Sequence, residues 1–245
     1  MKNIKMKSFK KQLKKYLFTK GYVVSKINNA PLQNSNPFLA CKSRINTSEP
    51  LIFDVGMNHG QTLKKIRNVF PGAIIYGFEA SKYCFKQLET DFKDKNIFLN
   101  NLGLADKEGV LEFNEYSWDA LNSFLNRAQG KAQIIETYNV SVTTIDDYCV
   151  KNQINHIHIL KSDTEGFELK VLNGANKMMN ENKIQFVLVE LFFDLNFIGQ
   201  SSVGEIFSNL EKHNFSHVKF YDFSLTGEGL SSKSDALFIN NNFNK

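Results

Sequence analysis

Four acidic residues occur along the chain at places where they could act together on one ligand. Each lies at or near the end of a short run of apolar and β-branched residues, the pattern of a buried strand. The four are Asp54, Glu79, Asp163 and Glu190. Because the carboxyl ends of neighbouring parallel strands face one crevice, we expect these side chains to meet at one edge of a sheet. Carboxylates in such a crevice can bind hydroxyl or ammonium groups, accept a proton, or hold a divalent cation.

A glycine turn follows the first of these acids and reads D-x-G-x-x-x-G, from Asp54 through Gly56 to Gly60. It predicts a strand, a tight turn that includes Asn58, and a helix whose first N–H groups are free to bind a ligand. The spacing differs from the G-x-G-x-x-G of dinucleotide sites, and an acid just before the turn would repel a pyrophosphate. It suits a ligand with an ammonium group and hydroxyls, such as S-adenosylmethionine. The alternative is an ordinary turn with a solvated Asp54.

The second acid, Glu79, ends the next predicted strand and is placed to accept hydrogen bonds from both hydroxyls of a ribose. The alternative is a capping role for the helix that begins after Ser81. We include the adjacent Ala80 among the expected cofactor contacts. After the third strand, Ala105 and Asp106 could hold an adenine, with Asp106 accepting from its exocyclic amine; the alternative there is a plain hairpin turn.

A sheet must position these acids, and the pattern from Leu51 onward alternates strands with helices. This alternation predicts an α/β fold with a mostly parallel sheet and helices on both faces. The last two strands, Val218–Phe223 and Ala236–Asn240, are expected to be antiparallel, because the segment between them is too short for a crossover helix. The other strands are predicted at 51–55, 73–79, 97–102, 110–116, 140–145, 157–163 and 185–191. Helices are predicted after the turns at 56–60, 79–81 and 164–166, the third through Ala175, and over 203–213.

The first part of the chain differs from the rest in charge. The first twenty residues carry eight lysines and no acid, and residues 1–27 have a thin amphipathic helical pattern. We favour a solvated helix with one face docked on the domain, and the alternative is contact with an anionic membrane surface. Residues 28–49 are rich in turn formers and predict a linker or a lid. The chain therefore divides into a basic segment, 1–50, and a folded domain, 51–245.

Composition sets broad limits on the protein. A chain of 245 residues can bury one substantial core. Without the basic segment the charge is slightly acidic, so a nucleic-acid partner is not expected. The three cysteines are far apart, without metal-binding spacing, and indicate thiols in a reducing cytoplasm. We expect neither a membrane span nor a secretion signal.

Several motifs together point to a family. They are Phe53–Gly60, Phe78–Ala80, Thr144–Tyr148, Leu160–Glu168 and Val171–Ala175. With them the chain resembles the FkbM family of S-adenosylmethionine-dependent methyltransferases, over roughly Leu51 to Asn240. The last two motifs are the specific ones, because the family reads there like L-K-I-D-V-E-G-x-E-x-x-V-L-x-G-A. The chain departs from the family at Met57, Ala80 and Ser162, where Ala, Pro and an apolar residue are usual.

The resemblance implies a Rossmann-like class I methyltransferase with a seven-stranded sheet and an antiparallel last strand. It also implies methyl transfer to a hydroxyl, commonly on a sugar or a polyketide. The acceptor oxygen must lie in line behind the methyl group, and a base must take its proton. Asp163, which should also contact the cofactor and face its methyl group, and Glu165 are the expected bases. Lys161 could pair with a carboxylate or orient the acceptor. By analogy with catechol-type O-methyltransferases, Asp163 and Glu190 could hold Mg²⁺ or Mn²⁺; the alternative is an ion pair between Glu190 and Lys161.

Other residues carry weaker expectations. His59 could contact the methionine carboxylate or face solvent in its loop, Asp235 could line an acceptor pocket, and His156 and His158 are expected to be structural. Aromatic residues could cover a sugar acceptor or fill the core. These are Tyr116, Trp118, Phe192, Phe193 and Phe197.

We expect the acceptor to be a carbohydrate, as a sugar nucleotide or a precursor of a surface glycan. The alternatives are another natural product, a nucleic acid or protein acceptor, or a binding protein without catalysis. The chain could also form a homo-oligomer.

Overall fold

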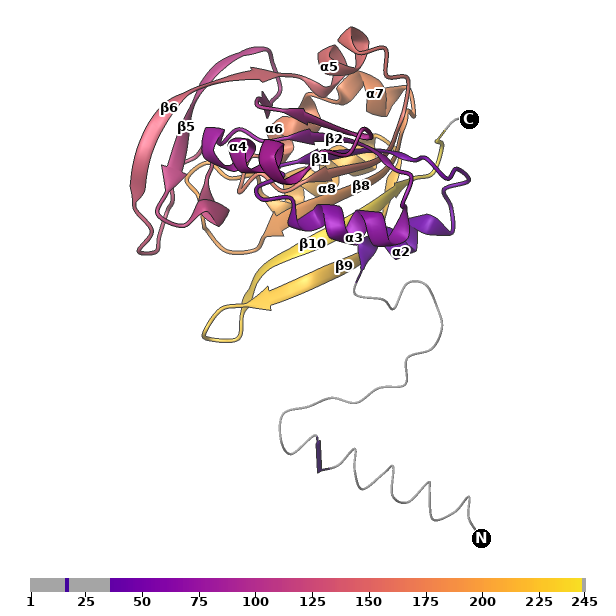
Figure 1. Cartoon of the computed structure of the whole chain (residues 1–245). Helices are drawn as coiled ribbons and strands as arrows, with labels where there is room; N and C mark the ends of the chain where they lie inside the picture. The colour runs from indigo at the N-terminus through magenta and orange to yellow at the C-terminus, as the bar shows by residue number, and fades with distance from the viewer. Residues whose placement is uncertain (1–15, 18–35, 244–245) are drawn as a thin grey trace. The chain divides into compact units, whose positions relative to one another are not determined.

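The computed structural model describes residues 36–243 and, before them, Tyr16 and Leu17 (Figure 1). Those two residues are helical, and the rest of the helix expected at 1–27 lies outside the described residues. The chain divides into two units, 1–34 and 35–245. The account below concerns the second unit.

Seven strands form the central sheet, in the order β3-β2-β1-β7-β8-β10-β9 (Figure 1). The pairs β3-β2, β2-β1, β1-β7 and β7-β8 are parallel, whereas β10 is antiparallel to both β8 and β9. The mostly parallel sheet and the antiparallel final pair are thus confirmed. The strands are β1 (Leu51–Val55), β2 (Ile74–Phe78), β3 (Ile97–Asn100), β7 (Ile157–Ser162), β8 (Ile184–Phe192), β9 (Phe215–Leu225) and β10 (Ser231–Asn240).

Both faces of this sheet are buried under helices. Successive strand residues point to opposite faces, so Ile52 and Ile159 pack in one apolar cluster while Phe53 and Leu160 pack in another. This explains why the central strands read as continuous apolar runs rather than alternating ones. The face that carries Ile52 and Ile159 is covered by α2 (Pro37–Lys42), α3 (Gln61–Val69) and α4 (Lys82–Asp91). The other face is covered by α5 (Ile145–Lys151), α6 (Glu168–Asn173), α7 (Asn176–Asn180) and α8 (Val203–Lys212).

The helix α2 corrects the expected boundary at residue 51. Its Phe38 and Cys41, together with Ile45, are buried in the same cluster as α3. The preceding Asn36 caps the helix by accepting from the N–H of Phe38, and Pro37 occupies the first helical position. The Asn-Pro pair that suggests a linker is therefore a helix start. The compact unit begins at Ser35 because this part of the predicted linker belongs to the core.

A second, three-stranded sheet was not expected. It has the order β4-β6-β5, from β4 (Gly103–Leu104), β5 (Gly109–Tyr116) and β6 (Ile134–Thr143). The two long strands form the curved antiparallel pair beside α4 in Figure 1. The strand predicted at 140–145 begins earlier, at Ile134, and ends at Thr143. It ends there because Thr144 accepts from the N–H of Asp147 and caps α5. The segment between β5 and β6 contains the short 3₁₀ helix η2 (Asp119–Leu121).

The helix predicted through Ala175 is broken at Gly174 into α6 and α7. Gly174 has ordinary helical angles, but a Cβ atom there would overlap the carbonyl oxygen of Ala105. A glycine is required because the backbone after β4 passes directly against this helix end.

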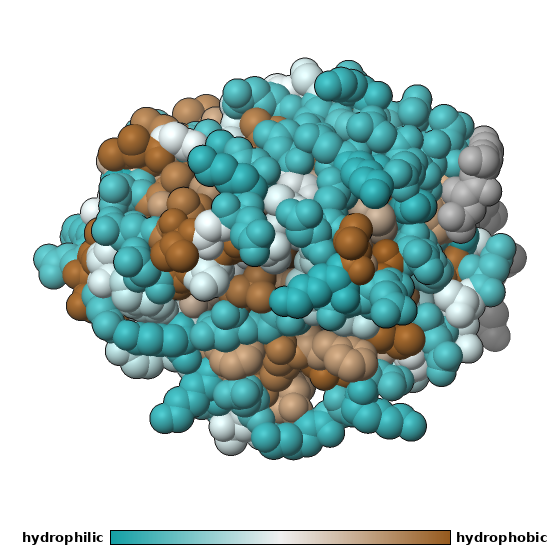
Figure 2. Space-filling model, turned by 90° about the horizontal axis from the view of Figure 1, so that it is seen from above, coloured by the Kyte–Doolittle hydropathy of each residue, from teal (hydrophilic) through white to brown (hydrophobic). Residues whose placement is uncertain are grey.

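The surface shown in Figure 2 is mostly hydrophilic, with hydrophobic side chains in separate small areas. None of the described helices is long and apolar enough to cross a membrane.

The contact at Gly174 gives a matched pair of variants for measurement. Gly174→Ala should lower the free energy of unfolding by roughly 1–3 kcal/mol or more, because a backbone carbonyl cannot move aside. Gly204→Ala is the control: it lies in α8 with no atom within 4 Å of the added Cβ, so stability should stay equal or rise by up to about 1 kcal/mol. Urea unfolding checks both, and equal stabilities for the two variants would contradict the packing described here.

Candidate active site

A pocket of about 370 Å³ opens at the carboxyl edge of the central sheet. The strand order reverses between β1 and β7, with β2 and β3 on one side and β8 on the other. Such a switch point leaves a crevice for a ligand. Residues that follow β1, β2 and β7 line the pocket together with Glu190 near the end of β8, and its volume falls within the range of roughly 300–1,000 Å³ typical of ligand sites.

The glycine turn brings β1 and β7 together at this point. Gly56 has φ +75°, and a Cβ atom there would overlap the carbonyl oxygen of Asp163. The N–H of Asp163 donates to the carbonyl of Val55 at 3.0 Å. Gly56 and Asn58, two of the residues predicted to contact a cofactor, line the pocket. Gly60 does not; it begins α3, where an added Cβ would lie 2.7 Å from the ring of Phe92.

Glu79 joins the ends of β1 and β2 beneath the pocket. One carboxylate oxygen accepts from the N–H of Asn58 at 2.6 Å and the other from the N–H of Ser81 at 2.7 Å. Burial raises the pKa of Glu79 to about 7, against the effect of these two donors. The capping of α4 is done by Ser81 itself, whose hydroxyl accepts from the N–H of Cys84. Glu79 and Ala80 both line the pocket.

Behind the pocket wall lies a buried ion pair. Asp54 and Lys161 are direct partners on β1 and β7, with Nζ 3.1 Å from Oδ1. Asp54 is fully buried, and among the described residues neither of its oxygens accepts a hydrogen bond of regular geometry. Burial raises the pKa of Asp54, and the ammonium of Lys161 limits that rise. Asp54, which was predicted to contact a cofactor, does not line the pocket; it is paired with Lys161 instead.

Lys161 reaches from this pair toward the pocket. Burial alone would lower the pKa of Lys161, but the carboxylates of Asp54 and Asp163 raise it above its usual value. Its Nζ lies 3.4 Å from Oδ2 of Asp163 and 3.4 Å from the carbonyl oxygen of Gly56, to which it donates. One ammonium group thus holds the ends of β1 and β7 in place.

Three carboxylates gather at the ends of β7 and β8. One oxygen each of Asp163, Glu165 and Glu190 lies within 4.8 Å of the others. Lys233, on β10, pairs with Glu190 at 2.7 Å and with Glu165 at 3.9 Å. The alternative of a Glu190–Lys161 pair is wrong, because Lys161 pairs with the two aspartates.

The environments of these acids separate their pKa values. Burial alone would raise the pKa of Asp163, but the ammonium groups of Lys161 and Lys233 lower it. Burial and the charge of Asp163 raise the pKa of Glu165 to about 8. The same two causes, with Glu165 added, raise the pKa of Glu190 well above its usual value. One acid therefore stays ionised next to others that readily hold a proton.

The turn that carries Glu165 is strained and firmly held. Glu165 has φ +52°, a left-handed conformation that is rare for a residue with a side chain. Oε1 of Glu168 accepts from the N–H and hydroxyl of Thr164 and from the N–H of Gly166. The Ser123 hydroxyl donates to the carbonyl of Glu165 at 2.9 Å. Such strain at a pocket wall indicates a functional position.

Other predicted residues are placed differently. Ala105 and Asp106 do not line the pocket: Ala105 is buried, and Asp106 pairs with Lys170 at 2.7 Å. Asp235 does line it. Five aromatic residues were expected to cover the pocket, and none of them lines it: Tyr116, Trp118, Phe192, Phe193 and Phe197. The aromatic residues that line it are Phe78, Phe113 and Phe124.

The segment between β5 and β6 also lines the pocket, but not through Trp118, the residue of this segment that was expected to cover it. In this segment the carboxylate of Asp119 accepts from Nε2 of His59 at 2.6 Å. The backbone carbonyl of Asp119 accepts from the side-chain amide of Asn58 at 3.2 Å. Among the lining residues of this segment are Asp119, Ala120 and Asn122. His59 is thus an exposed loop residue with a definite partner. His158 is structural, because its Nδ1 accepts from the N–H of Leu51.

The central sheet with its reversed final strand pair, and the pocket at its switch point, are those of a Rossmann-like α/β fold. The chain belongs to the FkbM family of methyltransferases. The sequence model described as the methyltransferase FkbM domain matches residues 54–216, which include the glycine turn and the turn around Glu165.

Solved structures of methyltransferases are similar to this chain at low identity. The methyltransferase FkbM from Methylobacillus flagellatus KT has a TM-score of 0.48 and 15% identity, over 80% of this chain and 45% of that one. This chain thus spans less than half the length of that protein. An rRNA methylase from Streptococcus thermophilus has a TM-score of 0.49 and 11% identity, over 88% and 99% of the two chains. No curated protein sequence matches the chain significantly.

The ion pair behind the pocket can be tested by a double-mutant cycle. Lys161→Met leaves the carboxylate of Asp54 buried without its cation and should lower the free energy of unfolding by about 3–5 kcal/mol. Adding Asp54→Asn should restore much of this loss.

The loss caused by Lys161→Met should also grow between pH 5 and pH 8. Lys161 limits the rise of the Asp54 pKa that burial causes, so removing it raises this pKa further. Stability falls as pH rises from the unfolded pKa toward the folded one, and the variant therefore loses more stability over this range than the wild type. Urea unfolding at the two pH values measures this. A loss independent of pH, with no recovery in the double variant, would show that Lys161 acts only by packing.

Proposed function

We propose that this chain transfers the methyl group of S-adenosylmethionine to a hydroxyl of a carbohydrate. The observation that carries the proposal is the group of carboxylates at the end of β7, beside the glycine turn. Asp163, Glu165 and Glu190 lie there with one oxygen each within 4.8 Å of the others. Their oxygens can accept hydrogen bonds from the hydroxyls of the substrate that receives the methyl group. One of them can also act as the base for the proton that O-methylation releases.

The residues around the switch point suit S-adenosylmethionine. Each oxygen of Glu79 accepts one backbone N–H and keeps a lone pair for a ribose hydroxyl. Phe78 and Leu104 give the same pocket apolar walls that suit an adenine ring, and Gly56 and Asn58 offer backbone at the turn. Bound there, the cofactor would supply a methyl group already activated by a sulfonium.

We assign different roles to the acids around the acceptor. Asp163, whose pKa is lowered, stays ionised and orients the acceptor hydroxyl together with Lys161. Glu165 lines the pocket on its strained turn and takes the proton. Its raised pKa matches a base that works near neutral pH.

The charge of the pocket supports a carbohydrate rather than a nucleic acid. Seven acidic side chains and three lysines line it, so the pocket stays net acidic although Lys65, Lys161 and Lys233 each pair with one of the acids. A net negative pocket disfavours phosphate groups, whereas its carboxylates accept hydrogen bonds from the hydroxyls of a neutral sugar. A glycoside without phosphates should therefore be the better acceptor, ahead of sugar nucleotides and RNA.

A divalent cation has a competitor at this site. The three carboxylates are hard oxygen donors that suit Mg²⁺ or Mn²⁺. However, the ammonium groups of Lys233 and Lys161 already lie against Glu190 and Asp163. We propose that these two lysines balance the carboxylates and that the reaction needs no added cation.

The cellular setting remains a prediction. All three cysteines are buried free thiols, which supports the expected cytoplasmic location. A homo-oligomer and a membrane contact through the basic first residues are likewise predictions.

Cofactor binding gives the first functional test. Calorimetry should show that the wild type binds S-adenosylmethionine and its demethylated product, and that Glu79→Gln weakens both by roughly 1–3 kcal/mol through the lost ribose acceptor. A product analogue without ribose hydroxyls should bind the two proteins equally. Glu136→Gln, an exposed acid paired with Lys82 outside the pocket, is the control. No binding of either ligand to the wild type would overturn the methyltransferase proposal.

Turnover gives the second test, using neutral glycosides, sugar nucleotides and RNA as acceptors. Neutral glycosides should be methylated best, and activity should survive EDTA. Glu165→Gln and Asp163→Asn should lower kcat by roughly 10²–10⁴-fold, whereas Asp106→Asn, outside the pocket, should not change it. Preferential methylation of RNA would overturn the choice of acceptor. Loss of activity in EDTA, with recovery in Mg²⁺, would show that a divalent cation, rather than the ammonium group of Lys233, balances the carboxylates during the reaction.

A further inference from the structure

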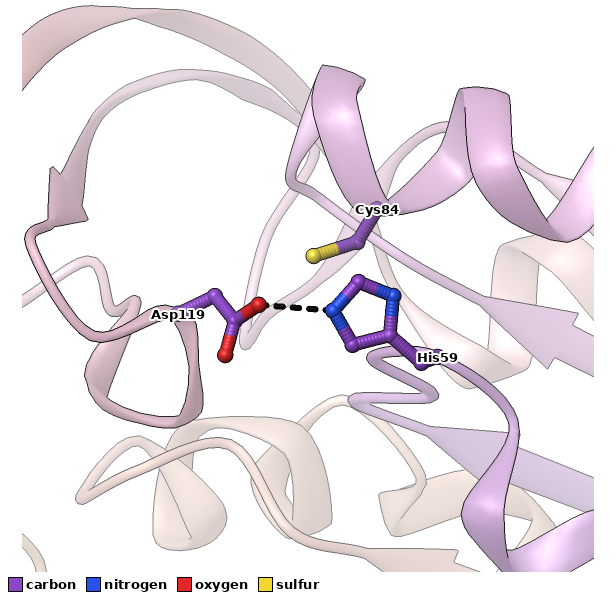
Figure 3. A group of neighbouring side chains, drawn as sticks. All are labelled: His59, Cys84 and Asp119. Atoms are coloured by element: carbon purple, nitrogen blue, oxygen red, sulfur yellow. Dashed lines mark hydrogen bonds and ion pairs between the residues drawn. The ribbon is translucent and has the colours of Figure 1, made fainter.

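A second group of potential ligands lies outside the acids used above. Among the described residues, His59, Cys84 and Asp119 bring one donor atom each to within 4.8 Å of the others. Figure 3 shows the thiol, the imidazole and the carboxylate pointing toward one another. They come from three separate elements: the turn after β1, the first turn of α4, and η2. Neither the proposed transfer nor the packing of the core requires a thiol and an imidazole at this place.

The donor atoms decide which ion would suit the group. A thiolate with an imidazole and a carboxylate is a typical set for Zn²⁺, whereas Mg²⁺ and Ca²⁺ prefer oxygen ligands only. Cys84 is buried, and the side chains of His59 and Asp119 are 41% and 46% exposed. An ion can therefore enter from solvent and reach the thiol at the inner end.

Small side-chain movements complete the geometry. Zn²⁺ bonds of about 2.0–2.3 Å separate the ligand atoms of a tetrahedral site by roughly 3.3–3.8 Å. Nε2 of His59 and Oδ2 of Asp119 are 2.6 Å apart, so they would have to part by about 1 Å. Both side chains are exposed and free to do so. Solvent would occupy the fourth position.

The surroundings of the thiol favour a cation. The carboxylates of Glu79, Asp119 and Glu115 act electrostatically on the thiol of Cys84. Glu115 is itself buried and accepts from the hydroxyl of Tyr138. A divalent ion in this negative environment would bind the thiolate while the thiol proton passes to solvent.

We propose that His59, Cys84 and Asp119 form a zinc site that fastens the η2 segment to the glycine turn and to α4. Asp119 and the neighbouring Ala120 line the pocket, as does Asn58 next to His59. Zinc at this position clamps the wall of the pocket without touching the acids at the end of β7. The proposal concerns metal binding alone and does not depend on the reaction proposed above.

Cobalt(II) is the probe for the first experiment. Titration of the full chain with Co²⁺ should give a thiolate-to-metal charge-transfer band and the visible bands of a tetrahedral ion. Cys84→Ser should abolish the charge-transfer band, whereas Cys149→Ser, at another buried free thiol in α5, should keep it. Co²⁺ bound without a thiolate band in the wild type would overturn the proposal, because the ion would then sit on oxygen ligands elsewhere.

Zinc affinity and backbone protection give a second measurement that does not require changing a buried residue. His59→Ala and Asp119→Asn alter exposed side chains and should weaken Zn²⁺ binding by at least about 100-fold, since losing an outer-shell partner alone costs 10–100-fold. In the wild type, Zn²⁺ should slow amide exchange over residues 117–123, and His59→Ala should remove this effect. Amide exchange that zinc does not change, or variants that bind zinc as tightly as the wild type, would show that the three side chains form no metal site.

Discussion

One ammonium group, that of Lys161, is the constraint on which the site depends. It lies between the fully buried Asp54 and the pocket acid Asp163, and it also donates to the backbone of the glycine turn. A buried charge pair rarely adds much stability beyond what an apolar pair would give, but removing one partner is very costly. The pair therefore fixes a geometry: it holds the end of β1 against the end of β7, where the sheet reverses its order.

That geometry explains why the neighbouring positions tolerate few residues. With β1 and β7 drawn together, only a glycine fits at Gly56, because the carbonyl of Asp163 occupies the space of a side chain. At the other end of the specific motif, Gly174 fits against the carbonyl of Ala105 for the same reason. Between them, Glu168 binds the turn through three hydrogen bonds and so supports the strained conformation of Glu165. The motif therefore serves mostly to pack the backbone closely around the half-buried carboxylate of Glu165.

Much of this could be predicted from the sequence, because it depends on local patterns. Strands that end in acids, the glycine turn and the order of elements place Asp163, Glu165, Glu190 and Glu79 at one edge. Contacts between distant segments could not be predicted. Lys233 reaches the acids through the pairing of β10 with β8, and no pattern in the chain specifies that register.

The same limit applies to α2 and to the segment around Asp119. An Asn-Pro pair begins either a turn or a helix, and only the burial of Phe38 and Cys41 decides between them. The polar segment between β5 and β6 has no periodicity, so its place at the pocket follows from tertiary contacts alone.

The position of β10 in the sheet links the closing of the fold to the charge of the site. This strand follows β9 in sequence, yet it lies between β8 and β9, and its pairing with β9 is irregular on both sides of Lys233. Lys233 meets Glu190 only where β10 is paired with β8. The strand that completes the sheet therefore also supplies the ammonium group that offsets the carboxylates.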